Sequence, residues 1–232
     1  MTVSTEKKAP FIDMTAMSDV TVLLLTFFML TSTFLQKEPT TVITPASVSE
    51  EKVPEQNLVT LLITKDSQIF MSVAGDRDST YSSEKMREEI LLNVVSEYNK
   101  KHQKKIELTN ADVATFGATY MFGLPLAEIA DWCKLPAEKR DAKLDPAKNK
   151  GAGIPIDMGK DVENRNEFQQ WMLALYNTSN PNLAKAIKSG KGIAIKADAT
   201  TPYSVVQVVM DNLQTLKMNK FTLMTALKTE ED

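Results

Sequence analysis

The chain has 232 residues, of which 25% are charged and 43% hydrophobic, a balance that suits one or two globular domains. The formal net charge of -3, without a dense basic stretch interleaved with aromatic residues, argues against nucleic-acid binding. A single cysteine, Cys133, excludes an internal disulfide and a thiolate metal cluster, and we expect it in the core. The one histidine, His102, lies among lysines, which indicates a solvated helix surface or loop.

The first segment that decides the class of protein is residues 14–35, which carry one charge, Asp19, and neither Gly nor Pro. As a helix, these residues would span about 33 Å, close to the hydrocarbon thickness of about 30 Å. The sequence therefore predicts a single transmembrane helix. A cleaved signal peptide would be shorter and would end in small residues, and a soluble core helix would show a polar face, so both alternatives fit less well.

The residues on either side of this segment predict its orientation. Residues 1–13 are too few to fold alone, whereas the part downstream is long enough to form a domain. We therefore expect a cytoplasmic tail over 1–13 and a domain outside the membrane. The positive-inside rule adds little to this orientation, because two lysines precede the helix, Lys7 and Lys8, and two follow it, Lys37 and Lys52.

Asp19 is the candidate functional residue of the membrane segment. A carboxylate in the hydrocarbon costs about 2.5–3.5 kcal/mol on insertion scales, so its protonation should depend on its surroundings. A lone helix exposes Asp19 only to lipid, which implies a partner with several helices. We expect Asp19 to take up and release protons, each worth about 2.3 kcal/mol per 100 mV. The alternative is a polar group that serves only packing or assembly.

A stripe of polar residues accompanies Asp19. The intervals of four, seven and seven residues place four side chains on one helix face: Thr15, Asp19, Thr26 and Thr33. This face could pack against a second copy or a partner helix, with the hydroxyls as hydrogen-bond donors. Alternatively, the hydroxyls bond to carbonyls of their own helix.

Residues 12–20 and 23–31 together resemble the N-terminal signature of the ExbD/TolR biopolymer-transport family. In that family the membrane aspartate carries protons, and the resemblance gives this role to Asp19. A second resemblance, to the closing strand, turn and helix of the family, covers residues 192–211. The resemblance assigns four residues to a periplasmic motif: Asp198, Pro202, Tyr203 and Asp211.

The resemblance implies a proton-motive-force-driven motor subunit in a bacterial inner membrane, without enzymatic activity or a cofactor. It implies three kinds of protein partner: a pentameric ExbB/TolQ-like membrane protein, a second copy of this chain, and a TonB- or TolA-like energy transducer. The expected output is TonB-dependent outer-membrane transport. Alternatives are a TolR-like or MotB-like stator acting on the envelope or on gliding machinery, and a passive anchored adaptor. Residues at about 106–165 depart from the compact family pattern.

The rest of the chain predicts a linker over 36–57 and a periplasmic domain over 58–232. We expect an α+β fold, a two-layer α/β sandwich with helices on one face and the insertion at about 106–165. The linker is rich in Pro, Thr, Ser and Glu, and its Val42-Ile43 pair could add a short strand to a sheet edge or a partner.

Within the domain, the hydrophobic patterns predict a hairpin over 58–73 and a helix from Ser82 or Ser83 to Tyr98. In the insertion, residues 126–134 predict a helix and 136–159 a loop. Helical spacing then resumes over 167–188. The final prediction is a strand over 193–196, a helix over 202–216 and a strand over 221–225.

No motif predicts catalysis. Asp157, Asp161 and Glu163 form a loose acidic cluster that surface solvation explains. Residues 189–192 read Ser-Gly-Lys-Gly and lack the glycine spacing of a phosphate-binding loop. We therefore do not expect a nucleotide to supply the energy.

Overall fold

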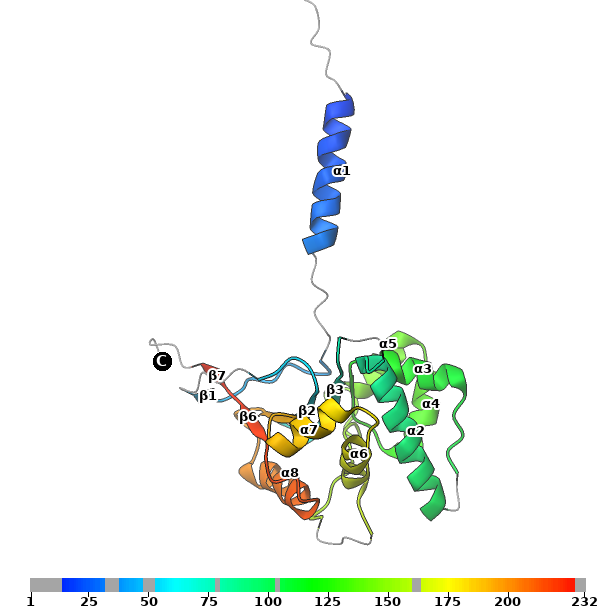
Figure 1. Cartoon of the computed structure of the whole chain (residues 1–232), viewed down its shortest axis with the longest axis vertical. Helices are drawn as coiled ribbons and strands as arrows, with labels where there is room; N and C mark the ends of the chain where they lie inside the picture. Colours follow the sequence, from blue (N-terminus) through cyan, green and yellow to red (C-terminus); the bar gives the residue numbers. More distant parts are fainter. Residues whose placement is uncertain are drawn as a thin grey trace, which may run out of the picture. The chain divides into compact units, whose positions relative to one another are not determined.

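The computed structural model describes residues 14–31, 38–47, 53–77, 80–102, 105–159 and 164–227. The chain divides into two compact units, Met1–Gln36 and Lys37–Asp232, which are considered separately below (Figure 1). The predicted tail over 1–13 and residues 32–35 of the predicted membrane span, Thr33 among them, lie outside the described residues.

The described part of the first unit is one helix, α1 (Met14–Thr31), and every side chain on it is exposed. It is long and apolar enough to cross a membrane, by length and composition. Its 18 residues correspond to about 27 Å of helix, close to the hydrocarbon thickness. An apolar helix with no buried side chain needs lipid or other helices around it.

The second unit is built on a five-stranded mixed sheet in the order β4-β3-β2-β5-β6. The strands are β2 (Leu58–Ile63), β3 (Ile69–Ala74), β4 (Met121–Phe122), β5 (Ile193–Ala197) and β6 (Thr222–Met224). β2 and β3 form the predicted antiparallel hairpin, and β5 runs parallel to both β2 and β6. The structure thus confirms the α+β class.

The two faces of this sheet differ in composition. The register places Leu61 beside Met71 and Ile195, and this face is apolar throughout the three central strands, as expected under helices. On the opposite face Leu62 lies beside Phe70 and Lys196. Both faces of β2 are nonetheless buried. Something other than a single helical layer must therefore cover the face of Leu62.

Four helices of this unit follow the predicted patterns: α2 (Ser83–Lys101), α6 (Glu167–Tyr176), α7 (Pro181–Ser189) and α8 (Tyr203–Thr215). The predicted cap, Ser82, accepts a hydrogen bond from the Lys85 amide at the start of α2. The predicted helical stretch over 167–188 is two helices. Asn180 begins the second one, since its side chain accepts hydrogen bonds from the amides of Asn182 and Leu183. Gly190, at φ 94°, ends it in the left-handed conformation.

The insertion contains three helices among the described residues: α3 (Asn110–Ala118), α4 (Leu126–Cys133) and α5 (Ala137–Leu144). The prediction of α4 is confirmed, but the loop predicted over 136–159 is wrong where α5 lies. Leu144 is the one buried residue of α5, so the segment has no apolar periodicity to read. α5 is held on α4 by a hydrogen bond from Trp132 Nε1 to the Arg140 carbonyl and by the Lys143–Glu128 ion pair.

An aromatic cluster joins the insertion to the core of the unit. The Phe116 and Trp171 rings stack with centroids 5.8 Å apart, and Phe122 lies 4.7 Å from Trp171. Trp132 meets Phe116 edge-on at 6.4 Å. All four side chains belong to the same buried cluster as the sheet. The apolar residues of the insertion therefore extend the core.

The single cysteine and histidine occupy the predicted environments. Cys133 is buried, and this burial is the main reason why the pKa of its thiol rises to about 11. The thiol is therefore protonated at neutral pH and a poor nucleophile. His102 is exposed at the end of α2 and stacks on Tyr98 with ring centroids 3.9 Å apart.

Candidate functional site

Asp19 is the only charged residue of α1, and it lies in the second turn of the helix. The helix offers its carboxylate no partner from its own backbone, because the amides at that depth already bond to carbonyls one turn back. The helix also exposes an apolar ridge beside it, formed by Val20, Leu23, Phe27 and Leu30, with Leu24 and Thr26 on the same surface. These features make α1 a helix with one costly polar group and a surface suited to helix packing.

The hydroxyls of Thr21, Thr26 and Thr31 bond to carbonyls of their own helix, α1. Thr26 Oγ1 donates to the carbonyls of Val22 at 3.0 Å and Leu23 at 2.9 Å. Thr21 and Thr31 donate in the same way to residues four positions earlier. The Thr26 hydroxyl therefore needs no partner outside the helix. This agrees with the alternative interpretation of the polar stripe, in which the hydroxyls bond to carbonyls of their own helix. A role for the stripe in packing stays a prediction.

Asp198, the first residue of the predicted periplasmic motif, forms a corner directly after β5. Its Oδ1 accepts hydrogen bonds from the amide and hydroxyl of Thr200, and its Oδ2 accepts one from the amide of Ile43 at 3.1 Å. Its own amide donates to the Ile63 carbonyl at the end of β2. The bonds from Thr200, and then the one from Ile43, hold the pKa of Asp198 below its usual value.

The other three motif residues lie along the helix that follows. Pro202 precedes α8, Tyr203 begins it with 70% of its surface exposed, and Asp211 lies eight residues further on. Eight residues correspond to about 12 Å along a helix. The motif therefore does not converge on one site: Asp198 fixes a corner, whereas Tyr203 presents an exposed aromatic ring.

Residues 38–43, here called the strap, cross the sheet face that carries Leu62. Both carboxylate oxygens of Glu38 lie 2.8 Å from Lys196 Nζ, and the register places Lys196 beside Leu62. Val42 is 9% exposed and belongs to the hydrophobic core. The carbonyl of Ile43 accepts a hydrogen bond from the amide of Ala199 at 2.8 Å. The strap thus lies within the predicted linker but is bound to the sheet.

The Val42-Ile43 pair was the sequence signal for this contact, but it does not add a strand to the five-stranded sheet. Instead, a two-residue strand, β1 (Ala46–Ser47), pairs in parallel with β7 (Ala226–Leu227). The partner of Glu38 could not be read from the sequence because Lys196 is 158 positions away. The domain boundaries proposed from the sequence, including a linker over 36–57, stay a prediction.

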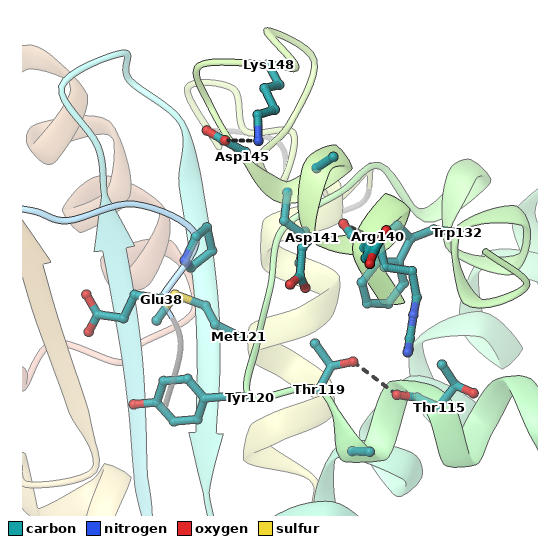
Figure 2. A pocket seen from close by; sticks show the side chains of 15 residues that line it. Glu38, Thr115, Thr119, Tyr120, Met121, Trp132, Arg140, Asp141, Asp145 and Lys148 are labelled. Carbon is teal, nitrogen blue, oxygen red and sulfur yellow. Dashed lines mark hydrogen bonds and ion pairs between the residues drawn. The ribbon is translucent and has the colours of Figure 1, made fainter. Parts of the chain in front are cut away.

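A groove of about 680 Å³ opens beside the strap, between β4 and α5 (Figure 2). Glu38 and Tyr120 lie on one side of it, and Arg140 lies on the other with its guanidinium 5.8 Å from the Trp132 ring (Figure 2). Asp145 on its rim pairs with Lys148 at 3.3 Å. Among the described residues no three His, Cys, Asp or Glu side chains gather in a way that could hold a metal ion.

The acidic cluster predicted around Asp157 is only partly described. Asp157 Oδ1 accepts hydrogen bonds from the Gly159 amide and from Asn166 Nδ2, and Asn166 in turn bonds to Asn212. These bonds fix the loop before α6 to α8. Asp161 and Glu163 lie outside the described residues. Asp157 therefore has a structural role in the part of the cluster that can be described.

An N-terminal helix long and apolar enough to cross a membrane, followed by an α+β domain, is the organisation of a membrane-anchored protein. The family model described as "Biopolymer transport protein ExbD/TolR" matches residues 5–120, from before α1 to the residue preceding β4. This match covers half of the 232 residues, and the chain belongs to the ExbD/TolR family. No curated protein and no solved structure matches the chain.

Family membership carries a functional class. ExbD/TolR proteins are non-enzymatic subunits that transduce energy for biopolymer transport. Among the described residues one helix is long and apolar enough to span a membrane, which fits a single-pass inner-membrane protein. The match ends at residue 120, so the motif over 192–211 and most of the insertion lie outside it. Asp19 lies inside it.

Proposed function

We propose that this chain is the proton-carrying subunit of an inner-membrane motor driven by the proton-motive force, with Asp19 as the residue that takes up and releases protons. The observation that carries the proposal is a single carboxylate in an 18-residue apolar helix, within the part matched by the ExbD/TolR family model. A carboxylate that is so costly to insert marks a candidate site for a function that needs charge inside the membrane.

A ring of partner helices follows from the same helix. Protons must reach Asp19 from one side of the membrane and leave toward the other, which a helix surrounded by lipid does not allow. An ExbB/TolQ-like pentameric membrane protein would enclose α1, and the apolar ridge of Val20, Leu23, Phe27 and Leu30 would pack on its helices. Two copies of the chain within one ring would place two Asp19 carboxylates at different positions relative to the ring.

The remaining parts of the proposal concern direction and output. The tail over 1–13 lies in the cytoplasm, and the α+β domain lies in the periplasm. There it passes work to a TonB- or TolA-like energy transducer that serves the outer membrane. Each proton crossing the potential supplies about 2.3 kcal/mol per 100 mV, which is sufficient to bias a conformational step of a few kcal/mol.

The first test is the composition of the complex. The full chain, tagged at its C-terminus and extracted in mild detergent, is expected to co-purify with a multi-helix membrane protein encoded beside it. The Asp19→Asn variant should retain that partner, because the amide keeps the size and polarity of the side chain. Recovery of soluble partners alone, without a membrane protein, would support the passive adaptor and contradict the motor.

A further inference from the structure

The strap holds the sheet through three contacts of different kind. Glu38 makes the ion pair with Lys196, and the Glu38 and Lys196 side chains are 28% and 21% exposed, respectively. Four residues later Val42 enters the core. The amide of Ile43 donates to the Asp198 carboxylate, and its carbonyl accepts from the Ala199 amide. A charged anchor, an apolar anchor and a backbone pair are the elements by which proteins bind extended peptides.

Burial along the strap is uneven. Pro39 and Thr40 are half-buried, Thr41, directly before the buried Val42, is exposed, and so is the side chain of Ile43. The strap is therefore held at its two ends and by one side chain, rather than by a continuous strand ladder. A segment held in this way can leave the sheet without disturbing the pairing of β2, β3 and β5.

The face beneath the strap is suited to a peptide once the strap has left. It presents Lys196 as a cation, Asp198 as an acceptor for a backbone amide, and the hollow that Val42 fills beside the core. The groove of about 680 Å³ adjoins the same face, because Glu38 and Pro39 form part of its wall. Departure of the strap would thus join the sheet face to an existing groove (Figure 2).

We propose that this sheet face is a docking site for an extended peptide, that the strap occupies it in cis, and that a partner segment of the same chemistry displaces it. The partner segment would carry a carboxylate and, four residues later, a β-branched apolar residue followed by a free backbone amide. Identifying this segment with part of an energy transducer rests on the proposed function; the docking site itself does not.

Competition in cis makes a quantitative prediction. A tethered strap acts at an effective concentration on the order of millimolar, so it masks the site from a free peptide. A carboxylate at position 42 would be buried without a partner, which disfavours the docked strap and should weaken it by roughly tenfold or more. A free peptide should then bind more tightly by the same factor.

The test uses the full chain in lipid nanodiscs and a labelled peptide with the sequence of residues 38–45. The Val42→Asp variant of the chain is expected to bind this peptide about tenfold more tightly than the unsubstituted chain does. The matched control is Thr41→Asp, which adds the same charge at the neighbouring exposed position and should leave peptide affinity unchanged. Circular dichroism verifies folding, and Val42→Ala serves as a milder second variant.

A charge exchange tests the contact itself. Adding Lys196→Glu to the Val42→Asp chain should lower its affinity for the peptide at least tenfold. A peptide with Lys in place of Glu38 should restore that affinity. Three outcomes would each overturn the proposal. The first is equal peptide affinity of the Thr41→Asp and Val42→Asp chains, and the second is no peptide binding to Val42→Asp or Val42→Ala at millimolar concentration. The third is that the exchanged charges do not restore binding. None of these assays depends on a proton gradient or on Asp19, so their failure leaves the motor untouched.

Discussion

Replacing Asp19 by Asn is expected to abolish proton-driven work while leaving the protein in the membrane and in its complex. The amide keeps the shape of the side chain but cannot lose or gain the proton that, in the proposed mechanism, couples the helix to the membrane potential. Every other described residue of α1 is uncharged. The chain offers no second group in the helix that could take over, so we expect complete loss rather than a reduction.

The measurement is uncoupler-sensitive proton uptake by vesicles that contain the purified complex, with Asp19→Asn compared against Asp19→Glu and Thr21→Val. The Glu variant keeps a titratable group on a side chain longer by one methylene and should retain part of the activity. The Thr21→Val variant removes a hydroxyl that bonds only to the Met17 carbonyl of its own helix, so it should behave like the unsubstituted chain. Full proton uptake by the Asn variant would remove Asp19 from the mechanism.

Truncating Trp171 to Ala should produce the largest loss of stability in the domain. The side chain is fully buried, stacks on Phe116 and contacts Phe122, so it joins α6 to the insertion and to β4. Large-to-small substitutions of buried aromatic residues cost about 3–5 kcal/mol, since they remove apolar burial and leave a cavity. For a domain of this size, that loss corresponds to a fall in Tm of roughly 6–20 °C.

Thermal and urea unfolding followed by circular dichroism would measure this loss. Tyr203→Ala is the matched control, because it also removes an aromatic ring, but one that is 70% exposed at the start of α8. We expect it to change the free energy of unfolding by no more than about 0.5 kcal/mol. Equal effects of the two substitutions would mean that the aromatic cluster does not form part of the core.

The elements that sequence alone predicted are those with local signals. The hairpin of β2 and β3 has two β-rich runs around a polar turn, and the turn closes with a bond from the Thr64 amide to the Gln68 carbonyl. The start of α2 has a serine cap ahead of an apolar period, and α7 ends at a glycine in the left-handed conformation. In each case the residues that decide the structure lie within a few positions of one another.

Contacts between distant residues could not be predicted in this way. The stack of Phe116 on Trp171 joins residues from the insertion and from α6, and the Glu38–Lys196 pair spans 158 positions. The helix α5 was missed for a different reason: its stability comes from contacts with α4 rather than from an apolar face of its own. Tertiary contacts of this kind have no periodic signal in one sequence.

The candidate functional residues divide along the same line. Asp19 could be found from the sequence because its unusual property, a charge within an apolar run, is local. The role of Asp198 could not, because its partner Ile43 comes from a segment that composition alone describes as a linker. Sequence reasoning placed Asp198 in a family motif, and the structure shows it joining the strap to the ends of β2 and β5.

The central claim is that the carboxyl group of Asp19 changes its protonation state inside the membrane. Difference infrared spectroscopy of the complex in lipid, recorded as the pH is stepped, reports the carbonyl band of a protonated carboxylic acid directly. We predict a band that appears and disappears reversibly with pH and is missing from Asp19→Asn. A carboxylate that stays ionised over the whole range, with identical difference spectra for the two proteins, would contradict the account.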